Sequence, residues 1–228
     1  MPYLALASDY DGTLAEHGRL TPEGRAALVR LRSSGCKVVL ITGRELGDFE
    51  RVCPELSLFD RLVTENGAVL VDSATGRQRA LTSGPPPRLI EELGKRGLTS
   101  LYRGQVIVAT TDAYEQELRD AIAAAELDWR LTLNKGAIMA LPAGVDKALG
   151  LRAALGELGI AADATVGVGD AENDIALLKA CGLGVAVAGA LPALREVADW
   201  VTSGDHGQGV AELVDRWLAD GLAGLGRR

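Results

Sequence analysis

The sequence predicts an α/β fold: a mainly parallel sheet core with helices on both faces, plus a small α+β domain inserted in the chain. In the first and last thirds, short apolar runs alternate with longer amphipathic stretches, which is the pattern of βαβ units. Three consecutive prolines, Pro85-Pro86-Pro87, interrupt this pattern, because proline continues neither a helix nor a sheet ladder. The expected division is a core of residues 1–81 and 144–228 and an inserted domain of residues 82–143.

The first third of the chain is expected to run β-α-β-α-β. Leu4 to Ser8 is short and apolar, as in a buried strand. Thr21-Pro22 then marks a helix start, with an N-cap side chain followed by proline in the first turn, and Gly35 ends that helix. Apolar runs and turn residues place the next elements as a strand at 37–41, a helix at 46–53 and a strand at 61–64.

The middle of the chain is expected to form a compact α+β unit, and the last third returns to the βαβ rhythm. A strand at 68–71, a turn at 72–76 and a polar strand precede the prolines. The inserted domain is expected to contain a helix at 88–97, a strand at 105–110, a helix at 114–125 and strands at 130–133 and 137–141. The last third is expected to contain helices at 147–158, 173–180 and 209–218 and strands at 164–168 and 184–187.

The composition excludes several classes of protein. The chain has 228 residues, and 24 Lys+Arg against 31 Asp+Glu give a net charge of −7. No nucleic-acid partner is expected, because such a partner requires a concentrated cationic surface. No run of about 18 apolar residues occurs, so no membrane span is expected. The N-terminus has no basic segment before an apolar one, and the three cysteines have no CxxC spacing, so a cytoplasmic protein is expected.

Two aspartates, Asp9 and Asp11, follow the first predicted strand. Side chains two residues apart on a strand share a face, so both are expected at one sheet edge. Open parallel sheets bind ligands in the crevice beyond the carboxyl ends of their strands. Two carboxylates so close need a cation or a shared proton, and hard carboxylate oxygens suit Mg²⁺. A solvated Asp-Gly turn is the alternative that this pair alone leaves open.

Two further motifs point to an anion. Thr42-Gly43-Arg44 follows the second predicted strand, where a hydroxyl and a glycine amide at a helix start form an anion site. An ordinary strand-to-helix turn is the alternative. Lys147 is expected in the first turn of a helix, where a cation is electrostatically unfavourable. The sequence therefore predicts an anionic group opposite Lys147, unless Lys147 is a simple surface lysine.

A fourth motif follows the predicted strand at 164–168. Asp170 is expected at the same sheet edge as Asp9, and Asp174 lies one helical turn beyond Asp170. Each of the four motifs alone has an ordinary structural explanation. Their occurrence together at strand ends favours a shared site.

The four motifs resemble those of the haloacid dehalogenase superfamily: Asp9-x-Asp11-Gly12-Thr13, Thr42-Gly43-Arg44, Lys147 and Gly169-Asp170-x-x-Asn173-Asp174. The resemblance covers the whole chain. The inserted domain lies between the third strand and the lysine, as in the type II capped, Cof-like (IIB) branch, which includes phosphoglycolate and sugar-phosphate phosphatases and phosphomannomutases. Glu65-Asn66-Gly67-Ala68 is also similar to that branch. The resemblance implies a Rossmann-like core and a type C2 cap formed by residues 82–143.

The resemblance also implies an activity and the residues that perform it. It implies a hydrolase of phosphoric monoesters that requires Mg²⁺ and forms an aspartyl-phosphate, with Asp9 as the nucleophile and Asp11 as the general acid and base. The implied catalytic set is Asp9, Asp11, Thr42 and Lys147. The implied substrate-binding residues are Thr13, Gly43, Arg44 and Asn173. The implied metal ligands are Asp9, Asp11 (through its main-chain carbonyl), Asp170 and Asp174.

Several roles remain open at this point. Arg44 is equally expected to serve the leaving group or to pair with a nearby acid, and His206 to contact substrate or, with slight preference, to cap the last helix. Arg103, Asn134 and Lys135 are candidate specificity residues, although a solvated loop is the simpler interpretation of each. The expected partner is a small phosphorylated metabolite. The alternatives are a phosphomutase on the same scaffold and a non-catalytic phosphosugar- or partner-binding domain, and the oligomeric state is open.

Overall fold

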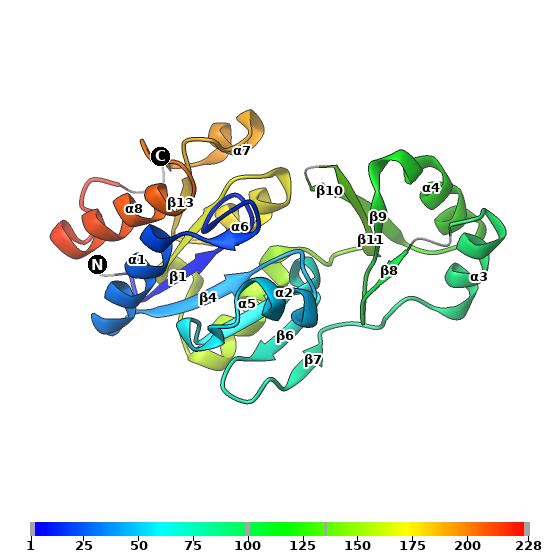
Figure 1. Ribbon diagram of the computed structural model, residues 1–228, viewed down its shortest axis with the longest axis horizontal. Coiled ribbons are helices and arrows are strands. Elements are labelled where there is room, and N and C mark those ends of the chain that lie inside the picture. Colours follow the sequence, from blue (N-terminus) through cyan, green and yellow to red (C-terminus); the bar gives the residue numbers. More distant parts are fainter. Residues whose placement is uncertain (1–2, 99–100, 135, 226–228) are drawn as a thin grey trace.

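The computed structural model describes residues 3–98, 101–134 and 136–225 and confirms the predicted α/β fold (Figure 1). Within these residues an eight-stranded sheet runs in the order β14-β13-β12-β1-β4-β5-β6-β7. Its strands are β1 (Ala5–Ser8), β4 (Lys37–Ile41), β5 (Arg61–Thr64), β6 (Val69–Asp72), β7 (Gln78–Ala80), β12 (Thr165–Gly169), β13 (Leu183–Ala186) and β14 (Trp200–Val201). The strands predicted at 37–41 and 61–64 have the observed bounds.

The sheet is parallel from β14 to β5 and antiparallel at the β6–β7 edge. The chain passes from β5 to β6 through a single 3₁₀ turn, η2 (Glu65–Gly67), which is too short for the crossover that a parallel pair needs. The central strands β1, β4 and β12 are almost continuously buried and apolar, as expected for strands covered by helices on both faces.

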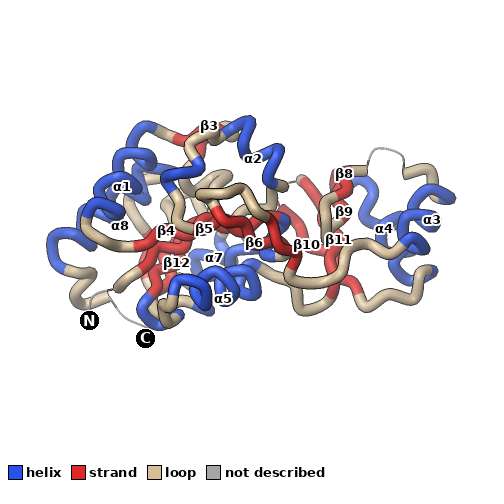
Figure 2. The backbone as a smooth tube through the Cα atoms, turned by 90° about the horizontal axis from the view of Figure 1, so that it is seen from below, coloured by secondary structure: helices blue, strands red, loops and turns tan. Residues whose placement is uncertain are grey.

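Helices cover both faces of the sheet (Figures 1 and 2). They are α1 (Pro22–Ser33), α2 (Leu46–Val52), α5 (Lys147–Leu158), α6 (Ile175–Ala180), α7 (Pro192–Val197) and α8 (His206–Asp220). The helix α1 begins as predicted, because the Thr21 hydroxyl accepts a hydrogen bond from the Gly24 amide at 3.0 Å. It packs closely on α8: a Cβ at Gly207 would lie 1.8 Å from the Thr21 hydroxyl. The helix α8 begins at His206, three residues before the predicted start at 209, because its N-cap is Asp205, whose side chain accepts from the His206 amide at 2.7 Å.

The inserted domain has its own sheet, in the antiparallel order β10-β11-β9-β8. Its elements are α3 (Pro87–Lys95), β8 (Tyr102–Arg103), β9 (Val108–Thr111), α4 (Glu115–Ala124), β10 (Trp129–Asn134) and β11 (Ala137–Pro142). The sheet lies toward the core and both helices lie on its far side (Figure 1). Alternation along β11 produces the two faces, because Ile138 and Ala140 pack with α3 and α4 whereas Ala137 and Met139 face the core.

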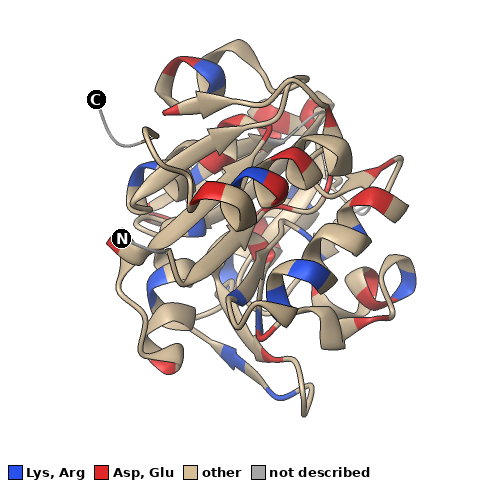
Figure 3. Ribbon diagram, turned by 90° about the vertical axis from the view of Figure 1, so that its left-hand side faces the viewer, with Lys and Arg blue, Asp and Glu red and all other residues tan. Residues whose placement is uncertain are grey.

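Short elements account for most differences from the predicted structure. The hairpin of β2 (Ala15–Glu16) and β3 (Arg19–Leu20), the helix α7 and the edge strand β14 were not expected. Strands of two residues are too short to show an alternating pattern. Acidic and basic residues are interspersed on the side of the core seen in Figure 3. Within the described residues, no helix is both long enough and apolar enough to cross a membrane.

Candidate active site

Three of the predicted motifs meet where three neighbouring strands end. β1 lies between β12 and β4, with Ser8 in register with Val168 and Leu40. The loops that follow these strands carry Asp9, Asp170 and Thr42, and the Asp9 amide donates to the Val168 carbonyl at 3.0 Å. Because β1 ends at Ser8, Asp9 and Asp11 lie in the loop rather than on the strand, yet both line one cavity. The predicted sheet-edge location is thus observed.

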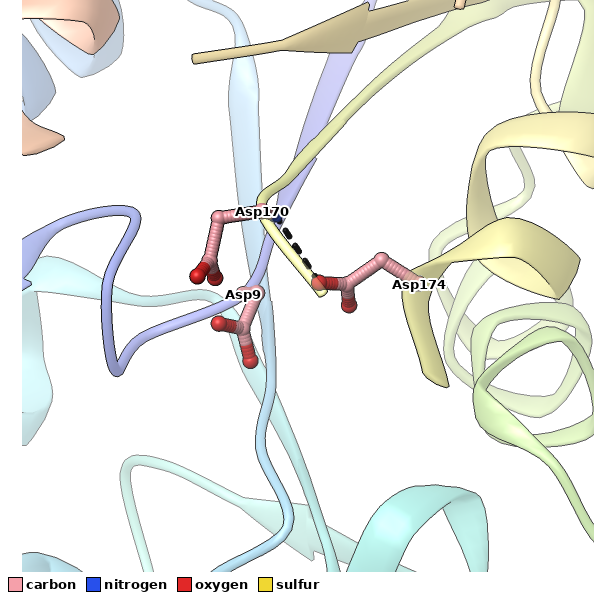
Figure 4. A group of neighbouring side chains, drawn as sticks. All are labelled: Asp9, Asp170 and Asp174. Atoms are coloured by element: carbon pink, nitrogen blue, oxygen red, sulfur yellow. Dashed lines mark hydrogen bonds between the residues drawn. The ribbon is translucent and has the colours of Figure 1, made fainter. Parts of the chain in front are cut away.

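Three buried carboxylates form a compact acidic cluster at this edge (Figure 4). Asp9, Asp170 and Asp174 each place a carboxylate oxygen within 4.8 Å of the other two. Asp174 is held in place because it accepts hydrogen bonds from the amides of Asp170, at 3.0 Å, and Ala171, at 3.1 Å. The Thr13 hydroxyl donates to Asp170 at 3.0 Å. The cluster is therefore built into the fold rather than left to solvent.

Lys147 faces two of these carboxylates, as the sequence predicts. Its side chain is completely buried, and Nζ donates to Asp9 at 2.6 Å and to Asp174 at 2.5 Å. It is the first residue of α5, whose N-cap, Asp146, accepts from the Leu149 amide at 2.8 Å. Burial alone lowers the pKa of Lys147, but the charges of Asp174 and Asp9 outweigh burial and raise it. Lys147 is therefore an ammonium ion that bridges two acids.

The cluster carries more negative charge than Lys147 balances. Three carboxylates against one ammonium leave an excess of two negative charges when all are ionised. Burial raises the pKa of Asp9 well above its ordinary range, and repulsion from Asp174 and Asp170 raises it further against the attraction of Lys147. Hard oxygen ligands with this charge fit a divalent cation, which would neutralise the excess.

The raised pKa of Asp9 predicts how the metal-free protein responds to pH. At any pH between the ordinary Asp9 pKa of 3.8 and its raised pKa in the folded protein, Asp9 is more protonated in the native state than in the unfolded chain. The free energy of unfolding therefore falls as pH rises through that interval. We expect the melting temperature of the metal-free protein to fall from about pH 5 to about pH 8 and to fall less in Asp9→Asn. Equal falls in both proteins, measured by differential scanning fluorimetry, would contradict this explanation.

Asp11 is paired with Arg44 instead of joining the acidic cluster. Arg44 donates to both oxygens of Asp11, at 2.7 and 2.9 Å, and to Asp48 at 2.5 Å. Of the two alternatives for Arg44, pairing with a nearby acid is observed. The main-chain amide of Arg44 also donates to the Thr42 hydroxyl at 3.1 Å. The predicted metal contact of Asp11, through its main-chain carbonyl, stays a prediction.

A cavity of about 320 Å³ lies between the core and the inserted domain, beside the acidic cluster. Its lining from the core consists of Asp9, Asp11, Gly43, Arg44 and Asp48. Its lining from the inserted sheet consists of Ala109, Ala137 and Met139. The cavity therefore has a charged floor and a small, largely apolar roof.

Other candidate residues lie around this centre. Asn173 is buried and donates to Asn66 at 3.0 Å, which joins the fourth motif to the turn after β5. His206 is not the helix N-cap, so that expectation is wrong: Asp205 caps α8, and the His206 ring contacts the Gly12 carbonyl at 2.9 Å.

The three candidate specificity residues have a different status. Arg103 is exposed on β8 and is absent from the described lining of the cavity. The side chain of Asn134 and all of Lys135 lie outside the described residues.

Asp48 was not singled out from the sequence, and Glu65 was noted only within the segment Glu65-Asn66-Gly67-Ala68, without a role of its own. Asp48 lies four residues after Arg44, a helical spacing that could have indicated the pair. Glu65 accepts main-chain hydrogen bonds from the inserted domain, and no spacing in the sequence signals such a contact across 40 residues. Neither residue belongs to the acidic cluster: Asp48 accepts a hydrogen bond from Arg44, and Glu65 binds the inserted domain.

Comparison with known proteins agrees with this geometry. A family model described as haloacid dehalogenase-like hydrolase matches residues 6–102 and 100–214. A phosphoglycolate phosphatase of Methanothermobacter thermautotrophicus is 31% identical over 226 residues, covering 94% of this chain and 98% of the relative. The 5-amino-6-(5-phospho-D-ribitylamino)uracil phosphatase of Bacillus subtilis is 28% identical over 236 residues, covering 93% and 95%. A crystal structure from Thermoplasma acidophilum matches 96% of this chain and 99% of its own with a TM-score of 0.81 at 17% identity. The chain belongs to the haloacid dehalogenase-like hydrolase family.

Proposed function

We propose that this hydrolase is a Mg²⁺-dependent phosphatase that acts on a small phosphorylated metabolite of the phosphoglycolate or sugar-phosphate class through an aspartyl-phosphate. The observation that carries the proposal is the position of Asp9, which lines the cavity while Lys147 fixes it and Asp170 and Asp174 flank it. The two relatives described above are named as phosphatases of different phosphorylated compounds. Their names support hydrolysis of a phosphate ester. Because the two compounds differ in the group esterified to phosphate, the identity of this leaving group is the main question for the present chain.

Asp9 is the proposed nucleophile. Lys147 holds one oxygen of its carboxylate at 2.6 Å, and we assign the attack on phosphorus to the other oxygen. The Asp9 oxygen–phosphorus bond forms while the bond from phosphorus to the leaving oxygen breaks. Water then attacks phosphorus, the bond to Asp9 breaks and orthophosphate leaves. A carboxylate nucleophile thus divides one difficult hydrolysis into two transfers.

Asp11 is the proposed general acid and base. It gives a proton to the leaving oxygen in the first step and takes one from water in the second. Arg44 donates one hydrogen bond to each oxygen of Asp11, and each oxygen keeps a further lone pair that can face the leaving oxygen. Arg44 therefore has the role of positioning Asp11 beside the cavity.

The remaining polar groups suit a dianionic phosphoryl group. Thr42 accepts from an amide, which leaves its own hydrogen for a phosphate oxygen, and the Gly43 amide is the second proposed donor. Thr13 orients Asp170 through its hydrogen bond. Asn173 directly precedes Asp174 of the cluster, and its hydrogen bond to Asn66 fixes its side chain. Mg²⁺ held by Asp9, Asp170, Asp174 and the Asp11 carbonyl would offset charge on the phosphoryl oxygens.

The inserted domain, residues 82–143, is the proposed cap. Its sheet supplies Ala109, Ala137 and Met139 to the roof of the cavity, opposite Asp9. A roof in this position excludes water and contacts whatever group is esterified to the phosphate. We therefore assign the choice of leaving group to the cap.

Orthophosphate release from a panel of phosphorylated metabolites tests the proposed function. With Mg²⁺ present, we expect release from one or more compounds, and we expect excess EDTA to abolish it and added Mg²⁺ to restore it, because the acidic cluster carries uncompensated charge. An isomeric sugar phosphate in place of orthophosphate would favour a phosphomutase. Saturable binding of a compound with no product would favour a binding domain, and activity unaffected by EDTA would contradict the metal requirement.

A further inference from the structure

Glu65 is a buried carboxylate that belongs to the core but binds the inserted domain. Glu65 is 2% exposed and is the first residue of the η2 turn after β5. One oxygen accepts from the Gln105 amide at 2.7 Å, and the other accepts from the amides of Val106, at 2.8 Å, and Ile107, at 3.1 Å. Among the described residues, no Lys or Arg forms an ion pair with Glu65. Three main-chain donors are thus the observed compensation for its burial.

The amides that Glu65 binds form the tip of the β8–β9 hairpin, residues 104–107. The tip is closed by a hydrogen bond from the Gly104 amide to the Ile107 carbonyl at 3.0 Å. Val106 and Ile107 are buried in the large hydrophobic cluster of the core, not in the separate cluster of the inserted domain. The hairpin tip is therefore docked into the core, and the Glu65 carboxylate is the polar part of that contact.

The fit around this carboxylate is close. A Cβ at Gly104 would lie 2.4 Å from a Glu65 oxygen, so any larger residue there must displace one of the two groups. Glu65 itself has a φ of 52°, and Asn66 has a φ of 56°, values that are uncommon for residues other than glycine. Neighbouring contacts hold the turn in this unfavourable conformation.

The same turn also contacts the catalytic elements. The Asn66 side chain accepts from Asn173 of the fourth motif at 3.0 Å. A Cβ at Gly67 would lie 1.9 Å from the Asp146 carbonyl, directly before Lys147. One three-residue turn therefore contacts the hairpin of the inserted domain, the fourth motif and the start of the lysine helix.

We propose that Glu65 is a positioning residue that sets the height of the cavity roof above Asp9 by fixing the β8–β9 hairpin to the core. The strand β9 continues directly from the docked tip to Ala109, which lines the cavity. A shift of the tip therefore moves the roof. This inference rests on the proposed function, because it concerns the leaving group that the roof contacts.

Glu65→Gln tests the inference, because it replaces one accepting oxygen with an NH₂ group that faces an amide donor. The matched control is Glu126→Gln: Glu126 also has a positive φ, of 51°, but is exposed, and no side-chain hydrogen bond from it is observed among the described residues. Gly104→Ala is a second variant that disturbs the same contact from the other side.

Hydrogen exchange of the amides of residues 105–107 is the first measurement. We expect exchange at least about tenfold faster in Glu65→Gln and Gly104→Ala than in the wild type, since a charge-assisted hydrogen bond is lost, and no change in Glu126→Gln. Unchanged exchange in Glu65→Gln would overturn the inference.

Steady-state kinetics are the second measurement. For the best metabolite of the panel, we expect kcat/KM to fall about tenfold, mainly through KM, in both variants that disturb the anchor. For acetyl phosphate, whose leaving acetate offers the roof fewer atoms to contact than the leaving group of a sugar phosphate does, we expect a change of less than about twofold. Faster exchange with the same relative preference for the two substrates as the wild type would overturn the positioning role. A wild type without turnover on any compound would contradict the proposed function, and the exchange rates would still decide whether Glu65 anchors the hairpin.

Discussion

Asp9→Asn is expected to lower kcat by at least about 10⁴-fold, to the background of the assay. The amide cannot attack phosphorus, so no aspartyl-phosphate forms, while Asn has nearly the same shape as Asp and keeps an oxygen toward Lys147. Because the variant loses one of three crowded carboxylates, we expect it to remain folded at neutral pH. Orthophosphate release in the presence of Mg²⁺ measures the effect.

A matched control distinguishes this chemistry from a general effect of removing an acid. Asp128 is exposed, and no hydrogen bond or ion pair of its side chain is observed among the described residues, so Asp128→Asn should keep kcat within about twofold of the wild type. Retention of more than about a hundredth of the wild-type kcat in folded Asp9→Asn would contradict Asp9 as the nucleophile.

Lys147→Met is expected to reduce both activity and stability. It leaves Asp9 and Asp174 buried without their shared ammonium ion, and breaking a buried ion pair by removing one partner costs about 3–5 kcal/mol. For a protein of this size, that loss lowers the melting temperature by about 6–20 °C. We also expect kcat to fall by about 10²- to 10³-fold, because the carboxylate of Asp9 loses its orientation.

The pH dependence of the stability loss identifies its cause. Without Lys147, the ionised carboxylates repel one another more strongly, so the deficit relative to the wild type should be larger at about pH 8 than at about pH 5. Lys95→Met is the control, because Lys95 is exposed and pairs with Glu92 on the surface of α3. A melting temperature of Lys147→Met equal to that of Lys95→Met at both pH values would contradict the role of Lys147 as the counter-charge.

The parts of the fold that the sequence predicts are those whose pattern is local. The strand at 37–41 and the helix at 147–158 have the observed bounds, because apolar runs and an N-cap lie within the segments themselves. The hairpin of β2 and β3 and the edge strand β14 depend on pairing between distant or very short segments, which periodicity does not show. The antiparallel edge at β6 follows from the short η2 turn.

The same distinction holds for the site. Strand ends converge at one edge of a parallel sheet, so the motifs alone predict that Asp9 and Asp170 lie together. Lys147, at the start of α5, was expected only to face an anionic group, which the structure identifies as Asp9 and Asp174. Pairing with a nearby acid was one of two equal alternatives for Arg44, and Asp11 was not named as that acid, because spacing does not decide which anion a guanidinium meets. The Glu65 contact is not predictable from the sequence, because it forms only where the β8–β9 hairpin docks on the core, and that position depends on how the two domains pack.

The central claim is that Asp9 carries the phosphoryl group during turnover. Rapid quenching of the Mg²⁺-loaded enzyme with substrate, followed by borohydride reduction, converts an aspartyl-phosphate to homoserine, and mass spectrometry of the peptide that contains residue 9 locates it. We predict homoserine at position 9 in the wild type, and none in the Asp9→Asn variant or without substrate. Homoserine at Asp11, Asp170 or Asp174 instead, or none at all while orthophosphate is released, would contradict the account.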